Sequence, residues 1–135
     1  YITKNSKYID KWKVFVPGAG GSGNDPYVLG KPIVAPSNSV CSQSFLFAAF
    51  DDDIQANNFK SYLLTKFFRA LVSAIKISQS APNRVYKFVP IQDFTNSSDI
   101  DWSKSIAEID KQLYSKYNLT QGEIDFIESK IKPLV

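Results

Sequence analysis

Residues 51–78 read DDDIQANNFKSYLLTKFFRALVSAIKIS and contain the clearest helical pattern in the chain. The three aspartates supply an N-cap and negative charge at the positive end of a helix dipole. At 100° per residue, most apolar side chains between Phe59 and Ile77 fall in one broad sector. We therefore expect one long, mostly buried helix from Ile54 to about Ser78, with a narrow polar strip facing solvent. That strip contains Tyr62, Lys66, Arg69, Ser73 and Lys76.

Short strands are expected before and after this helix. Alternating polar and apolar residues predict a strand at Lys11–Val16. Pro32 favours an edge position for a second strand at Lys31–Ala35. The mostly apolar run Ser42–Phe50 predicts a central, buried strand, and the alternation in Arg84–Pro90 predicts a strand that returns to the sheet.

Two amphipathic helices are expected at the C-terminal end, at Trp102–Tyr117 and Thr120–Ile131. The second begins with the capping-box sequence TQGE. The combination predicts an α+β fold: a small mixed or antiparallel sheet packed by one long central helix, followed by two C-terminal helices. A length of 135 residues fits a single domain. Residues 1–92 would form the sheet and long helix, and residues 93–135 a helical C-terminal extension.

The composition excludes several kinds of active site. The chain has no histidine and a single cysteine, Cys41, so His-dependent triads, Cys–His nucleophile pairs and internal disulfides are ruled out. We expect no catalytic residue, no metal and no cofactor in this segment. Because the chain lacks methionine and begins at Tyr1, we expect it to be a piece of a longer protein.

The hydropathy pattern contains no candidate membrane span. No apolar run approaches the roughly 20 residues that cross a bilayer, and the cysteine content fits a reducing compartment. We therefore expect a cytoplasmic protein without a membrane partner.

Two polar motifs have simpler explanations than ligand binding. The sequence GAGGSG at residues 18–23 is rich in glycine like a phosphate-binding loop, but NDP at residues 24–26 follows where a helix should begin. The three consecutive aspartates at residues 51–53 point in different directions, and helix capping explains them without a metal. We interpret the first motif as a surface loop and the second as a cap.

Positive charge is concentrated in the middle of the chain. Residues 54–92 contain six basic residues and no acidic one, whereas residues 93–135 contain five lysines and eight acidic residues. Donors without competing carboxylates are what phosphate binding requires, and Gln, Asn and Arg can read base edges. An ordinary solvated ridge of lysines would look the same and stays an alternative. The predicted DNA-binding residues are Lys66, Arg69, Ser73 and Lys76 on the helix, and Gln79, Asn83, Arg84 and Lys87 after it.

Several stretches of the chain have distinctive amino-acid sequences. They are DKWKVFVP at residues 10–17, GKP at 30–32, FKSYLLTKFFRALVS at 59–73, YKFVPIQDF at 86–94, and LYSKY through EIDFIE between 113 and 128. Together they resemble the C-terminal part of bacterial adenine-specific DNA methyltransferases of restriction–modification systems, including single-chain fusions with a restriction endonuclease.

The resemblance implies a target-recognition domain without chemistry of its own. In such enzymes the cofactor-binding and catalytic motifs lie upstream, and neither motif occurs in this sequence. The parent enzyme would flip an adenine out of the duplex and methylate it from S-adenosylmethionine. The implied partners are double-stranded DNA and the catalytic domain of the parent chain.

Two other functions are open at this point. The chain could be a protein-interaction or scaffold domain that packs on the rest of its parent, with Trp12, Phe15 and Tyr27 as interface anchors. It could also bind RNA through exposed aromatic residues such as Tyr62 and Tyr86. A steep salt dependence of binding to duplex DNA would separate the DNA-binding function from the interaction domain.

Overall fold

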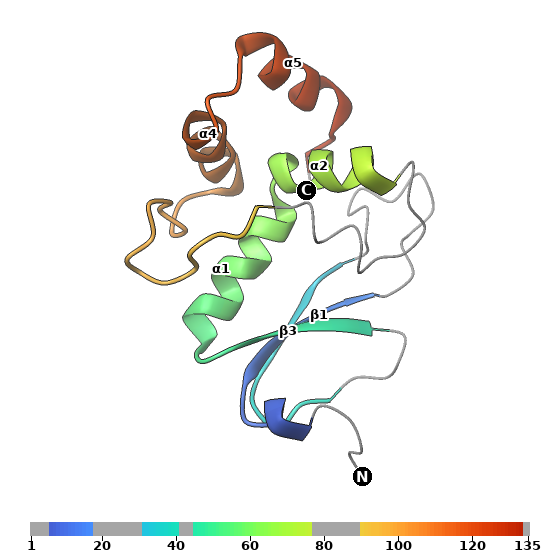
Figure 1. Ribbon diagram of the computed structural model, residues 1–135, viewed down its shortest axis with the longest axis vertical. Helices are drawn as coiled ribbons and strands as arrows, with labels where there is room; N and C mark the ends of the chain where they lie inside the picture. The colour runs from blue at the N-terminus through green and yellow to red at the C-terminus, as the bar shows by residue number, and fades with distance from the viewer. Residues whose placement is uncertain (1–5, 18–30, 41–44, 77–89, 134–135) are drawn as a thin grey trace.

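The computed structural model describes residues 6–17, 31–40, 45–76 and 90–133. In these residues a three-stranded antiparallel sheet lies at one end of the molecule, and the two C-terminal helices lie at the other (Figure 1). The predicted α+β class is confirmed. The elements are the 3-10 helix η1 (Ser6–Tyr8), β1 (Trp12–Pro17), β2 (Ile33–Ala35), β3 (Phe45–Phe50), α1 (Asp53–Leu64), α2 (Lys66–Lys76), α4 (Ile106–Lys116) and α5 (Gln121–Lys130).

The described strands are ordered β2-β1-β3. Val14 of β1 lies opposite Val34 of β2 on one side and Ala48 of β3 on the other. Among the described strands, β1 is therefore the central one and not Ser42–Phe50 as predicted, and β2 lies at an edge as predicted. The reason is burial: the four side chains Lys13–Val16 of β1 are all buried, so β1 is covered on both faces. Residues 47–50 of β3 are only half-buried.

The helix that the sequence predicts over residues 54–78 is two helices in the described residues. Asp52 caps α1 as expected, because its Oδ1 accepts a 2.8 Å hydrogen bond from Gln55 N–H. The helix then stops at Thr65, whose backbone is extended (φ −68°, ψ 151°), and α2 leaves in a different direction (Figure 1).

Thr65 closes one helix and opens the next. Its hydroxyl donates to the carbonyl of Tyr62 at 2.6 Å and accepts from the N–H of Phe68 at 3.0 Å. Threonine satisfies the free N–H groups at a helix start in this way. The wheel drawn for one continuous helix therefore does not hold across residue 65. Tyr62, expected on the solvent strip, is 2% exposed.

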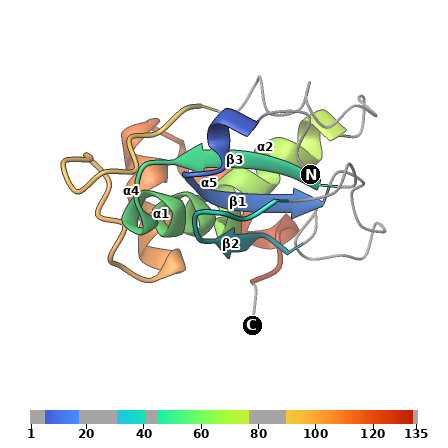
Figure 2. The same ribbon diagram turned by 90° about the horizontal axis from the view of Figure 1, so that it is seen from below.

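The core lies on both sides of this pair of helices. α1 contacts all three strands, and both α1 and α2 contact α4 (Figures 1 and 2). One cluster of buried residues runs from Val14 and Val16 of β1 through α1 and α2 to Ile109 and Leu113 of α4. Because α1 and α2 are covered from two directions, little of either helix is left as a solvent-facing strip.

An irregular segment between residues 90 and 105 wraps the outer side of α1. Phe94 inserts between Phe59 and Trp102, with ring centroids 5.2 and 5.3 Å away. Tyr62 donates to the Pro90 carbonyl at 3.0 Å, and the Trp102 indole donates to the Asp93 carbonyl at 2.8 Å. These hydrogen bonds fix the segment against the helix while the rings fill the core.

The two C-terminal helices form as expected, with one change of boundary. The capping box predicted at Thr120 is present, since Thr120 and Glu123 bond each other's backbone N–H. α4 begins at Ile106, four residues later than predicted, because Ser105 and Glu108 form a second capping box. Trp102 belongs to the turn that precedes α4. It lies in the core and is only 7% exposed. The predicted strand at Arg84–Pro90 lies, except for Pro90, outside the described residues.

Candidate functional site

The predicted DNA-binding residues divide into three groups. Lys66, Arg69 and Ser73 of α2 have described side chains. Lys76 is the last residue of α2, and its side chain is not described. The remaining four residues, Gln79, Asn83, Arg84 and Lys87, lie outside the described residues.

Arg69 does not lie on an exposed ridge. Arg69 is 2% exposed, and its side chain is among the largest fully buried side chains in the described residues. Nε donates to the Thr65 carbonyl at 3.2 Å, and Nη1 donates to the Lys132 carbonyl at 2.7 Å. The guanidinium thus ties the start of α2 to the chain that follows α5. The expectation of a solvent-exposed Arg69 is wrong, because the C-terminal segment covers it.

Lys66 is paired with an acidic residue. Its Nζ forms an ion pair with the Glu128 carboxylate of α5, and the Lys66 side chain is 18% exposed. Sequence reasoning placed no acid near this lysine, since Glu128 lies 62 residues away along the chain. Ser73, the third described residue, is half-buried.

Asp110 of α4 caps α2 from a distance. Its two carboxylate oxygens accept from the backbone N–H of Lys66 at 3.0 Å and of Phe67 at 2.8 Å. The residue is 2% exposed. Burial raises the pKa of Asp110, and the two N–H groups and the positive Arg69 act in the opposite direction. A carboxylate at this place also meets the positive end of the α2 dipole.

These residues form one cluster, which we call the polar cluster: Lys66 and Arg69 of α2, Asp110 and Tyr114 of α4, and Glu128 of α5. The Tyr114 hydroxyl donates to Glu128 Oε1 at 2.9 Å. Burial raises the pKa of Tyr114, so the phenol stays protonated and can donate. The hydrogen bond from Lys66 lowers the pKa of Glu128, which therefore stays charged. The polar cluster holds three helices together, and this structural use accounts for both positive charges.

The acidic members of the polar cluster were missed by sequence reasoning. One signal was available: Asp110 stands between Ile109, Leu113 and Tyr114 on the apolar face of α4. A carboxylate on the buried face of a helix needs partners, and the free N–H groups of another helix start are suitable ones.

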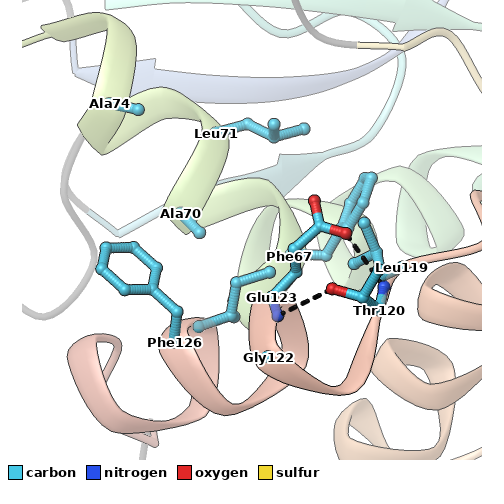
Figure 3. Close-up of a pocket in the computed structure, with 10 residues that line it drawn as sticks. Phe67, Ala70, Leu71, Ala74, Leu119, Thr120, Gly122, Glu123 and Phe126 are labelled. Carbon is cyan, nitrogen blue, oxygen red and sulfur yellow. Dashed lines mark hydrogen bonds between the residues drawn. The ribbon is translucent and has the colours of Figure 1, made fainter.

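An apolar groove lies between α2 and α5, beside the polar cluster. It has a volume of about 480 Å³. Phe67 and Glu123 stand at one end, and Ala74 and Phe126 at the other (Figure 3). Phe126 is 62% exposed, so the groove is open to solvent on the α5 side. The remaining lining residues are Ala70, Leu71, Leu119, Thr120, Gly122 and Ile127.

Of the aromatic residues proposed for the alternative functions, the three that the structure describes lie in or against the core. Phe15 is 8% exposed, and Trp12 packs partly buried against the core cluster. Tyr62 is buried by the segment that carries Phe94. Tyr27 and Tyr86 lie outside the described residues. Trp12, Phe15 and Tyr62 therefore do not form the exposed anchors or stacking platform that those functions need.

Within the ranges that the structure describes, no group of three or more acidic or cysteine side chains could hold a metal ion. In the same ranges, none of the helices has the length and apolar character needed to span a bilayer.

Comparison with known proteins identifies no relative. No family model, no curated protein and no solved structure matches this chain.

Proposed function

We propose that this chain is a sequence-specific recognition module for double-stranded DNA within a restriction–modification methyltransferase. The observation that carries this proposal is the separation of charge along the chain: residues 54–92 hold six basic residues and no acidic one. Such a segment attracts a polyanion and releases its counterions on binding. The resemblance of the chain to the C-terminal part of adenine-specific methyltransferases supplies the class of enzyme.

The polar cluster changes which residues the proposal uses. Lys66 and Arg69 already have partners within the fold, so we assign DNA contact to the region from Ser73 onward. Lys76 and Lys87 would hold backbone phosphates. Gln79, Asn83 and Arg84 would lie near base edges, where amide and guanidinium groups discriminate between bases.

The proposal leaves the chemistry to another part of the enzyme. A cytoplasmic parent protein would bind S-adenosylmethionine and transfer its methyl group to a flipped adenine, and a restriction endonuclease could share the chain. The present residues would choose the DNA sequence and pack on the catalytic domain.

The test is the salt dependence of DNA binding. Fluorescence anisotropy of a labelled mixed-sequence duplex would be followed from about 50 to 200 mM salt with the wild-type chain and with Lys76→Ala/Lys87→Ala. Each lost phosphate contact should reduce the slope of log affinity against log salt by about 0.9, and both substitutions should weaken binding.

The matched control is Lys104→Ala/Lys130→Ala, which removes two exposed lysines outside the basic segment. Its effect should be small compared with that of the first pair. The proposal is wrong if both double variants weaken binding equally, or if the folded wild-type chain does not bind DNA at the lowest salt.

The second candidate is a protein-interaction domain that packs on the rest of its parent chain. The observation that favours it is the open apolar groove between α2 and α5. Binding through an apolar surface would depend little on salt, which separates this function from DNA recognition.

A further inference from the structure

The helix α5 is only partly docked on the rest of the molecule. None of its ten residues is buried. Ile124 and Ile127 pack against the core cluster, whereas Phe126 projects beside the groove and is 62% exposed. A large aromatic ring beside an open apolar groove is a feature of interaction surfaces.

Small residues line part of the groove. Ala70 and Ala74 are one turn apart on α2, and Gly122 lies opposite them in the first turn of α5 (Figure 3). Small residues permit a second backbone to come close, as they do between packed helices. Leu71 and Phe126 form the walls, so the shape suits a helix that places a bulky side chain between α2 and α5.

Gly122 has no structural reason to be glycine within the described chain. A Cβ built on it would meet only the Thr120 hydroxyl oxygen, at 4.0 Å, which is ordinary contact. A helix is less stable with glycine than with alanine at the same position. A glycine that the fold does not need is explained when another chain approaches closely at that point.

One end of the groove carries a negative charge. Glu123 accepts from Thr120 N–H with Oε1 at 2.9 Å, and among the described residues no donor lies on its other carboxylate oxygen. The hydrogen bonds from Thr120 lower the pKa of Glu123, so the group is ionised at neutral pH. An apolar groove that ends at a carboxylate fits an apolar ligand with a positive group at one end.

We propose that this groove binds an amphipathic helix of a protein partner, which seats a bulky apolar side chain between α2 and α5 and pairs a Lys or Arg with Glu123. The apolar lining, the unneeded glycine and the terminal carboxylate each match one part of such a helix. The described lining of the groove does not include Ser73, and the groove gives the interaction-domain candidate a specific surface.

The probe is a designed, fluorescein-labelled amphipathic peptide of about 18 residues, with leucines at helical spacing and lysines beside them. Its anisotropy would be followed on titration with the whole 135-residue chain. Two comparison peptides carry glutamate in place of lysine, or the same residues in scrambled order. We expect the lysine peptide to bind, the glutamate peptide to bind more weakly, and the scrambled peptide not to bind.

Three substitutions locate the binding on the groove. Gly122→Ala and Ala74→Leu add bulk to the lining of the groove and should each weaken binding about tenfold or more. Gly122→Ala should at the same time raise the thermal unfolding midpoint, because alanine stabilises a helix. A variant that is more stable but binds less cannot be explained by loss of folding.

Glu123→Gln keeps the acceptor for Thr120 but removes the charge. It should weaken binding of the lysine peptide by about threefold and should not weaken binding of the glutamate peptide. The matched control is Asp125→Asn, an exposed acidic residue of α5 that does not line the groove. Asp125→Asn should change the affinity for either peptide less than Glu123→Gln does.

Several outcomes would overturn the proposal. They are no binding of the lysine peptide at millimolar concentration, equal binding of the scrambled peptide, and unchanged binding to Gly122→Ala and Ala74→Leu. None of these outcomes bears on DNA binding, which uses other residues and a different readout. Failure of the groove and failure of DNA recognition are therefore distinguishable.

Discussion

α1 and α2 are adjacent in sequence but are held by different chemistry. On α1, Phe59 and Tyr62 pack in a cluster of aromatic rings with Phe94 and Trp102. On α2, the residues nearest the break are held by the carboxylate of Asp110 and by the other members of the polar cluster. Apolar burial is insensitive to charge, whereas the polar cluster depends on every partner keeping its protonation state. We therefore expect changes of pH and substitutions of charged residues to act on the polar cluster, and cavity-forming substitutions to act on the aromatic cluster around α1.

The largest effect is expected in the aromatic region. Trp102→Ala removes a ring that contacts Tyr62 and Phe94 and is 7% exposed. The cavity and the lost hydrogen bond to Asp93 should lower the free energy of unfolding by about 3–5 kcal/mol. Urea unfolding followed by circular dichroism measures this difference.

Because about 5 kcal/mol can unfold a domain of this size, Trp102→Phe provides a milder version of the same change. The control is Phe126→Ala, which removes an aromatic ring that is 62% exposed. An equal loss of stability from Phe126→Ala would show that burial does not distinguish the two positions.

The next effect is expected at Arg69. Arg69→Ala removes the hydrogen bonds to Thr65 and Lys132 and takes away a positive charge near Asp110. Loss of a buried charged partner should lower the free energy of unfolding by about 2–4 kcal/mol. The same variant, if enough of it remains folded, should show a salt dependence of DNA binding equal to that of the wild type. A shallower slope with unchanged stability would instead place Arg69 in contact with DNA.

The sequence predicts local features of this molecule well. The cap at Asp52 and the box at Thr120 and Glu123 lie within three residues of the groups that they bond. Their chemistry is visible in a short window of sequence, so the sequence alone predicts both. The α+β class follows from the same short-range patterns, because strand and helix periodicities differ.

The features that the sequence does not predict depend on distant partners. The break at Thr65 is stabilised by Asp110, 44 residues from Lys66. The burial of Arg69 depends on Lys132, 63 residues away. A helical wheel contains no information about which element packs on the outer face of the helix, so it places the polar strip in solvent. Of the candidate site, the positive charge was predictable, but its use within the fold was not.

Asp110→Asn is expected to be less destabilising than Arg69→Ala. Asparagine keeps one acceptor for the start of α2, but its amide group cannot accept from the second N–H. The free energy of unfolding should fall by about 1–2 kcal/mol.

The pH dependence of this difference has a definite sign. The pKa of Asp110 is raised in the folded chain, so its contribution to stability is fully present below the unfolded pKa of about 4 and decreases as pH rises through the folded pKa. The gap in unfolding free energy between wild type and Asp110→Asn should therefore be larger near pH 4 than near pH 7. A gap that widens with rising pH would show that the carboxylate is stabilised and not penalised by its surroundings.

The smallest effect is expected at Glu128, where the polar cluster reaches the surface. Glu128→Gln keeps an acceptor for the Tyr114 hydroxyl and removes the ion pair with Lys66. Because the Glu128 side chain is 42% exposed, solvent screens this pair, and its loss should lower the free energy of unfolding by only about 0.2–1 kcal/mol. The pKa of Glu128 is lowered in the folded chain, so its contribution is present above the ordinary carboxyl range and is lost as pH falls. Stability measured at low and high salt near pH 7 should differ less in Glu128→Gln than in the wild type. Equal salt effects would mean that the ion pair contributes nothing to stability and that α5 is held by its other contacts, among them those of Ile124 and Ile127.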